Sequence, residues 1–276
     1  MIRRLFRTFL FIVLIFFSTS CANSPQKEIN PKKIISLNKL YKAAYASFEN
    51  GKYNEALELF QKVENDYSYT EWASKALLMR SYIYYDSSRY LDALANIQKF
   101  KTRYAGSKDL AYAEYLIAMC LFEQVGIVSL SQENTKLALK QFKKIIEKYP
   151  NSIFVEDSKF KIDLLVEQLA GKEMYLARYY MKRQKWVPAL YRLNNIYKNY
   201  QTTIYIEEAL HRLVEINYKI GNIESAKKYA SILGYNFNNS DWYKKTYNLI
   251  EKKNYSIYKK KEKKNFKEKF LQLIRN

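Results

Sequence analysis

Residues 51–60 begin a pattern of small and aromatic residues that returns along the chain. In each copy, an apolar residue is followed three positions later by alanine, and two more apolar residues follow that alanine after four and seven positions. The copies are Tyr53, Ala56, Phe60 and Val63; Tyr90, Ala93, Ile97 and Phe100; Trp186, Ala189, Leu193 and Ile196; and Ile223, Ala226, Ala230 and Leu233. Self-similarity with a period in the mid-thirties indicates an array of stacked helix pairs.

The alanine of each copy has a physical explanation. Where two helices cross only a methyl group fits, and the residues four and seven positions later lie on the same helical face. Each copy is then the second helix of a pair. The first helices have small residues of their own, which are Ala44, Ser81, Ala118 and Ala177. Gly51 and Gly221 stand between the helices of two pairs, where a positive φ ends one helix before the next begins.

This pattern resembles the tetratricopeptide repeat, and the composition supports an all-α interpretation. The 276 residues include only 6 Gly and 4 Pro but 27 Tyr and 15 Phe, which leaves few turns and much aromatic packing. We therefore predict an α-solenoid of about five tetratricopeptide-like helix pairs over residues 37–235. A capping helix over residues 236–250 is expected to cover the last apolar face.

The N-terminal sequence predicts the cellular compartment of the protein. Three arginines precede an apolar run over residues 9–17, and small residues then lead to Cys21. This order is typical of a secretory signal over residues 1–20, which is too short to span a bilayer. A cysteine directly after small residues is typical of a bacterial lipoprotein, so we predict acylation of Cys21 and a flexible tether over residues 21–36. The alternative is an ordinary signal peptide with an incidental cysteine.

Positive charge is a second constraint on partners. The formal net charge of +20 favours phosphate head groups, nucleic acid or an acidic protein surface, and does not choose among them. Much of this positive charge lies in residues 251–276, which contain ten Lys or Arg and three Glu, a net charge of +7 (ten minus three). Four apolar residues of this segment share one helical face, namely Phe266, Phe270, Leu273 and Ile274. A basic amphipathic tail on a membrane, a tail docked on a partner helix and a disordered, solvated tail all remain open.

The sequence contains no arrangement of residues typical of an enzyme. It has no Gly-rich phosphate-binding loop and no Gly-x-Ser-x-Gly motif, and His211 alone cannot form a His-based metal site. If Cys21 carries lipid, Cys120 has no intrachain partner and is expected to be a small core residue. We predict a binding scaffold with no catalytic residue, no metal site and no cofactor.

The repeat register predicts a binding groove. In tetratricopeptide arrays the first helices line the concave side, and the residues three before, one after and five after each small residue point into it. The aromatic residues at or beside these positions are Tyr41, Tyr45, Phe48, Tyr82, Tyr85, Tyr115 and Phe122. With acids at their rim, they would suit an extended or aromatic-rich peptide. The alternative is that these rings pack between neighbouring helices.

Several segments together resemble the BamD family of outer-membrane lipoproteins over about residues 21–235. They are the lipoprotein-type signal, the repeats, Tyr149-Pro150-Asn151-Ser152, and a long helix leading into Ala177-Arg178-Tyr179-Tyr180 and Trp186. The resemblance implies a lipid-anchored protein on the periplasmic face of the outer membrane that helps to fold and insert β-barrel proteins. A nucleic-acid partner is not expected.

The resemblance also implies two kinds of partner. The N-terminal repeats would receive the C-terminal signal of unfolded outer-membrane β-barrel proteins, which ends in an aromatic residue. The C-terminal repeats would hold the periplasmic domain of BamA, the barrel-bearing subunit, with other Bam lipoproteins such as BamE around them. The partner-binding residues expected on this chain are Arg178, Arg192, Tyr218 and Lys219. Arg192 matches a basic position of the family, which implies an ion pair with the partner.

Two other functions fit the pattern less well. One is a periplasmic tetratricopeptide lipoprotein in cell-wall synthesis or pilus assembly, which would lack a stoichiometric outer-membrane barrel partner. The other is a cell-wall hydrolase or its activator. That activity would depend on His211 or on an acidic groove residue, and the sequence offers no arrangement for it.

Overall fold

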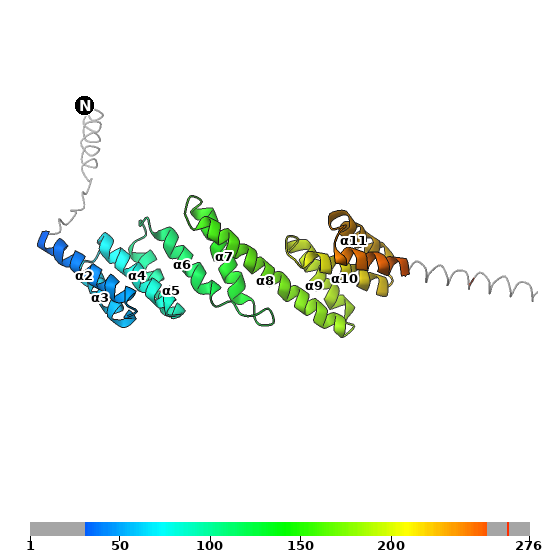
Figure 1. The fold of residues 1–276 in the computed structure, drawn as a ribbon, viewed down its shortest axis with the longest axis horizontal. Coiled ribbons are helices and arrows are strands. Elements are labelled where there is room, and N and C mark those ends of the chain that lie inside the picture. The colour runs from blue at the N-terminus through cyan, green and yellow to red at the C-terminus, as the bar shows by residue number, and fades with distance from the viewer. Residues whose placement is uncertain (1–30, 253–263, 265–276) are drawn as a thin grey trace, which may run out of the picture.

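The computed structural model describes residues 31–252 and residue 264, and each described element is a helix (Figure 1). The helices are α2 (Pro31–Glu49), α3 (Tyr53–Asp66), α4 (Glu71–Asp86), α5 (Tyr90–Arg103), α6 (Leu110–Phe122), α7 (Glu133–Lys148), α8 (Val155–Lys182), α9 (Trp186–Asn199), α10 (Ile206–Lys219) and α11 (Ile223–Asn236). Residues 241–252 are also helical. Within this part of the chain, five consecutive pairs and one further helix confirm the predicted all-α solenoid.

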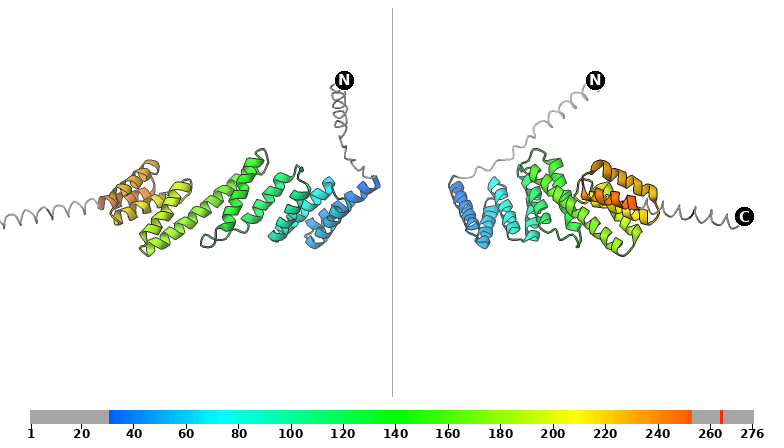
Figure 2. Two further views of the ribbon diagram at one scale, coloured as in Figure 1. Left: turned by 180° about the vertical axis from the view of Figure 1, so that it is seen from behind. Right: turned by 45° about the vertical axis from the view of Figure 1, so that its right-hand side comes forward.

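The helices follow one another along the long axis of the molecule (Figures 1 and 2). Each helix from α3 to α10 packs against the helix before it and the helix after it, and the first helices α2, α4 and α6 also touch one another in turn. The core is accordingly divided into clusters between neighbouring helices. This is the arrangement of a repeat protein, in which each unit is stabilised mainly by its neighbours.

The small residues of the repeat lie at the helix crossings, as their spacing predicted. Eight of them have no exposed surface: Ala44, Ala56, Ser81, Ala93, Ala118, Ala177, Ala189 and Ala226. The large residues four and seven positions after the second-helix alanines are buried beside them, as Phe60 and Val63 are in the first pair. The pattern therefore reports packing between helices, where any larger side chain would force the backbones apart.

The turns within four of the five pairs contain a left-handed residue. Gly51 and Gly221 have φ values of 72° and 85°, which glycine adopts without strain. Ser88 and Gln184 occupy the same place in two other pairs and also have positive φ, at 59° and 57°. The repeat geometry thus imposes this conformation even where glycine is replaced.

Relief of this strain is a testable consequence. We expect Gln184→Gly to raise the free energy of unfolding by about 0.5–1 kcal/mol, since left-handed φ costs a side chain about 1–2 kcal/mol and glycine's freedom in the unfolded chain cancels part of the gain. Urea denaturation followed by circular dichroism measures the change. Gly51→Ala is the reverse control and should lose a similar amount. An unchanged or lower urea midpoint for Gln184→Gly would contradict this account.

Helix α8 departs from the regular repeat because it serves two units. Its first half buries Leu165 in the cluster around Phe142 of α7, and its second half buries Met174 and Ala177 in the cluster that includes α9. At 28 residues, α8 is about twice the length of its neighbours, and it is the long helix that the sequence predicted before Trp186. At the other end of the array, α2 begins at Pro31, inside the predicted tether, and proline is tolerated in a first helical turn.

The helix at residues 241–252 covers the end of the array. Leu249 and Ile250 pack against the buried cluster of Val214, Tyr218 and Ala226 from α10 and α11. Without this cover the last apolar faces would meet water, which is the usual reason for a terminal cap in repeat proteins.

Some of the expected features lie outside the described residues, namely the signal, the acylation of Cys21 and nearly all of the basic tail. Among the residues that are described, no helix is both long and apolar enough to cross a bilayer. Cys120 is buried in α6 with a free thiol, whose pKa burial raises to about 12. It is therefore a core residue and a poor nucleophile.

Candidate functional site

Four of the predicted groove residues form a continuous chain of rings across the first two helix pairs. Tyr45 and Phe48 lie on α2, and Tyr82 and Tyr85 lie on α4. Ring centroids are 6.1 Å apart between Tyr45 and Phe48, 5.8 Å between Phe48 and Tyr82, and 6.2 Å between Tyr82 and Tyr85. We call these four residues the aromatic chain. Tyr45 is 42% exposed, so at least this end of it is open to a ligand.

Two carboxylates near the aromatic chain accept hydrogen bonds from tyrosine hydroxyls. The hydroxyl of Tyr85 donates to Oε1 of Glu123, directly after α6, at 3.3 Å, and that of Tyr53 donates to Oδ2 of Asp86 at 2.6 Å. Burial, followed by the charge of Glu123, raises the pKa of Tyr85 above its ordinary value. The phenol therefore stays protonated and keeps donating. Instead of forming a free acidic rim, Asp86 and Glu123 link neighbouring repeats.

The remaining predicted groove residues are placed differently. Tyr115 stacks on Phe154 with centroids 4.6 Å apart, and its hydroxyl donates to Asp157 of α8 at 2.6 Å. Phe122 packs edge-on against the buried ring of Phe142. These two rings fill the space between neighbouring helices, the alternative that the sequence left open. Among the described residues, neither ring forms a ring–ring pair with a member of the aromatic chain.

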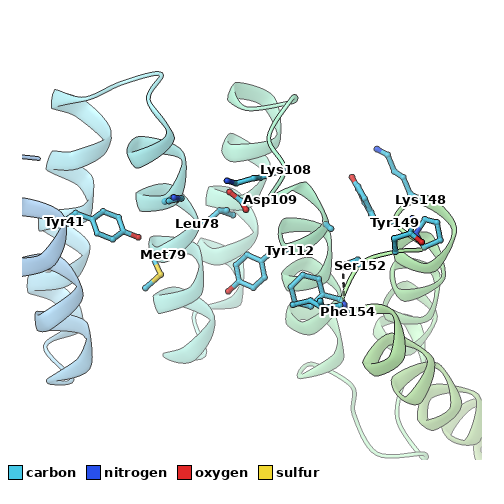
Figure 3. A pocket seen from close by; sticks show the side chains of 15 residues that line it. Tyr41, Leu78, Met79, Lys108, Asp109, Tyr112, Lys148, Tyr149, Ser152 and Phe154 are labelled. Carbon is cyan, nitrogen blue, oxygen red and sulfur yellow. Dashed lines mark hydrogen bonds between the residues drawn. The ribbon is translucent and has the colours of Figure 1, made fainter. Parts of the chain in front are cut away.

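Tyr41 lines a separate open cavity of about 820 Å³ further along the same helices (Figure 3). Leu78 and Met79 of α4, Tyr112 of α6 and Phe154 surround it, and the loop from Lys148 to Phe154 forms one wall. Three lysines lie around this apolar lining, namely Lys75, Lys108 and Lys148. The cavity can therefore accept an apolar or aromatic group, with cations nearby for an anion.

Sequence reasoning missed most of this cavity. Lys75 and Tyr112 each lie six positions before the small residue of their helix, so extending the register by one helical turn would have found them. The wall at residues 148–154 has no such signal, because its position depends on how α7 and α8 meet.

The predicted partner-binding residues lie in two places. Arg178 of α8 binds Glu208 of α10, and Glu208 also binds Arg212, whose Nη1 donates to Glu215 at 2.8 Å. Lys219 joins this network of ion pairs, because its Nζ lies 3.3 Å from Oε1 of Glu215. The same Nζ lies over the ring of Trp186. Arg178 and Lys219 therefore share one network of charges, and both are exposed.

Arg192 and Tyr218 do not belong to that network. Arg192 lies on α9 and pairs with Glu173 of α8 at 3.2 Å, so within this chain it already has a counter-charge. Tyr218 is only 6% exposed and packs under the terminal helix. Its side chain is therefore part of the core and is not accessible to a partner, in contrast to the sequence-based expectation.

His211 has a structural environment. It is buried, its Nδ1 lies 2.8 Å from Oγ1 of Thr246 in the terminal helix, and its ring lies beside Trp242. Burial, followed by the charge of Arg212, lowers its pKa, so the imidazole is neutral at physiological pH. The described residues also contain no group of three or more His, Cys, Asp or Glu side chains that could hold a metal ion.

These features define the class, a tetratricopeptide-like solenoid with an aromatic surface and an apolar cavity on its N-terminal first helices. Residues 35–233 match the family described as YfiO, outer membrane lipoprotein. Curated relatives named outer membrane protein assembly factor BamD share this region. This chain belongs to the BamD (YfiO) family.

The relatives come from several bacteria. The BamD of Caulobacter vibrioides is 37% identical over 211 residues, which cover 76% of this chain and 69% of the relative. That of Rickettsia prowazekii is 37% identical over 216 residues, covering 78% and 85%. That of Neisseria meningitidis is 30% identical over 213 residues, covering 73% and 79%. Among solved structures, the type IV pilus biogenesis factor PilW aligns with a TM-score of 0.36 at 14% identity, covering 76% of this chain and 97% of PilW.

Proposed function

We propose that this protein is an assembly factor for outer-membrane proteins, held at the periplasmic face of the outer membrane by lipid on Cys21. Its family membership supports this proposal, because the relatives are named for that role. The same names do not favour a function in cell-wall synthesis or pilus assembly. We propose a binding role without catalysis, since the relatives are assembly factors and His211 is used in packing.

Unfolded β-barrel proteins would bind to the N-terminal helix pairs. The observation that carries this part is the aromatic chain, which runs over α2 and α4 with Tyr45 exposed at one end. An unfolded β-barrel segment exposes alternate apolar and aromatic side chains, and aromatic pairs contribute about 0.5–1.5 kcal/mol each beyond their buried area. The cavity beside Tyr41 and Tyr112 offers a second place for such a side chain.

The C-terminal helix pairs would hold the periplasmic domain of BamA, with other Bam lipoproteins such as BamE nearby. Arg178 and Lys219 are exposed members of one charge network, which suits a partner surface with acidic groups. Arg192 would join them from α9. No nucleic-acid partner is proposed, because these basic residues are already interleaved with Glu208 and Glu215.

The groove assignment can be tested by crosslinking. We expect Tyr45→Ala with Tyr82→Ala to lower crosslinking to a peptide ending in an aromatic residue about tenfold, since two rings of the aromatic chain are lost. A photoreactive peptide and the mature full chain are used, and circular dichroism checks helicity.

The matched control is Tyr191→Ala with Tyr235→Ala, which removes two exposed rings elsewhere on the solenoid. This variant should capture the peptide normally. If the Tyr45 and Tyr82 variant captures as much peptide as the control, clients bind elsewhere and the groove assignment is wrong.

A further inference from the structure

One side of α8 is covered along only part of its length. Leu164, Gly171 and Arg178 are seven residues apart and so share this side of the helix. Around Gly171 and Arg178 it is covered by α10 and the loop before it. There Arg178 binds Glu208, and a Cβ on Gly171 would lie 2.9 Å from the hydroxyl of Tyr205.

The loop before α10 covers this side of α8 only as far as Ile204. The backbone N–H of Ile204 donates to Oε1 of Glu167 at 3.0 Å, which fixes this residue against the middle of α8. Its own side chain is 79% exposed, and toward the start of α8 the same side presents Leu164 at 43% and Phe160 at 60% exposure. We call Phe160, Leu164 and Ile204 the α8 apolar patch.

The reason for this patch is the length of α8. The first half of α8 packs on α7, as the first helix of a pair normally packs on the preceding helix. The second helix of the same pair, α9, begins only at Trp186. The first half therefore lacks the neighbours that a regular repeat would supply on its far side. Figure 1 shows α8 running from α7 to α9 as one continuous helix. An apolar helix face without a neighbour is a docking surface for an amphipathic helix.

Charge indicates what kind of helix fits. Acidic residues flank the α8 apolar patch: Glu156 and Asp163 on α8, and Glu207 in the first turn of α10. Lys159 pairs with Glu156, both at the exposed surface. Asp163 and Glu207 have no ion pair among the described residues, so a basic amphipathic helix would supply their complementary charge.

The chain contains one segment with that chemistry. Residues 251–276 carry a net charge of +7 (ten Lys or Arg minus three Glu), and Phe266, Phe270 and Leu273 follow the i, i+4, i+7 spacing of a helix that binds in a groove. The twelve residues from Lys252 to Lys264, where the docked segment begins, can span up to about 42 Å, which matches the roughly 42 Å length of α8. We propose that residues 264–276 dock intramolecularly on the α8 apolar patch.

Docking would supply the missing neighbour at the one helix shared by the third and fourth pairs. It would also make this patch unavailable to other molecules while the tail is bound. This inference is independent of the proposed function, because it uses neither the groove nor BamA.

The test uses the full mature chain with Cys21→Ser and a photoreactive benzoylphenylalanine in place of Phe270. Irradiation should yield an intramolecular crosslink, which mass spectrometry maps to residues 156–167 or to Ile204. Phe160→Ser with Leu164→Ser should lower its yield about tenfold, and Asp163→Lys should lower it at low salt. Leu91→Ser with Val187→Ser removes two residues that are 80% and 79% exposed elsewhere, and should leave the yield unchanged.

Circular dichroism verifies that each variant keeps its helicity. A crosslink between two copies, a crosslink mapped to any other surface, or a yield that the patch variant does not reduce would overturn the proposal. So would capture of phospholipid in place of the crosslink within the chain when anionic vesicles are present.

Discussion

Replacing Glu64 by Gln is expected to lower the free energy of unfolding by about 3–5 kcal/mol, because it leaves a buried cation without its counter-charge. Glu64 lies on α3 with 1% of its side chain exposed, and its Oε2 accepts a hydrogen bond from Nη1 of Arg80 at 2.8 Å. Arg80, on α4, is itself only 9% exposed. Lys99 and Arg103 of α5 bind the same carboxylate, which therefore joins three helices of the first two pairs.

Glu114 of α6 is the matched control for this prediction. It is equally buried, but its partners Lys101 and Lys144 are 24% and 42% exposed and can turn toward water. We expect Glu114→Gln to cost only about 1–2 kcal/mol. Urea denaturation of both variants measures the difference. Equal losses would contradict the argument that the buried cation sets the cost at Glu64.

Glu114 also gives a pH dependence with a defined sign. Burial raises its pKa, but hydrogen bonds from Lys144 and Lys101 outweigh burial and hold the pKa below the ordinary value. The contribution of Glu114 to stability is therefore present at neutral pH and is lost as the pH falls through that lowered pKa.

Arg192→Glu is expected to weaken binding of the BamA periplasmic domain by about 2 kcal/mol, roughly thirtyfold, if Arg192 forms the proposed ion pair. The intrachain pair with Glu173 complicates this variant, because reversal would set two carboxylates against each other at a site where the present pair is 3.2 Å apart. The double variant Glu173→Arg with Arg192→Glu restores the intrachain pair with its charges exchanged.

Comparing the two variants shows whether Arg192 contacts the partner directly or only positions α8 and α9. If Arg192 touches the partner, the double variant recovers stability but not binding, as measured by co-purification of the complex at moderate salt. Recovery of both would show that Arg192 only holds α8 and α9 together. Lys198→Glu reverses an exposed charge on the same helix and should bind normally.

The candidate site could be predicted only in part, for identifiable reasons. The register of the small residues located Tyr45, Phe48, Tyr82 and Tyr85 correctly on α2 and α4, where their rings meet. It could not reveal that Tyr115 faces Phe154, because the loop before α8 brings that ring into place. Contacts between rings at equivalent positions of the first helices α2 and α4 follow from the repeat spacing, whereas the contact of Tyr115 with Phe154 depends on where the next loop and helix are placed.

Interactions between residues close in the sequence are sufficient to determine the helix pairs of this protein. A small residue at the helix crossings and a left-handed residue at four of the five turns within pairs, whether Gly51 or Gln184, determine the helix pairs, because both requirements act within a few residues. The tertiary structure alone decides that Tyr218 is buried and that Arg192 pairs with Glu173. It also decides that α8 has an uncovered side. These features depend on how far one repeat is displaced from the next, and that displacement is the sum of many packing contacts between residues distant in the sequence.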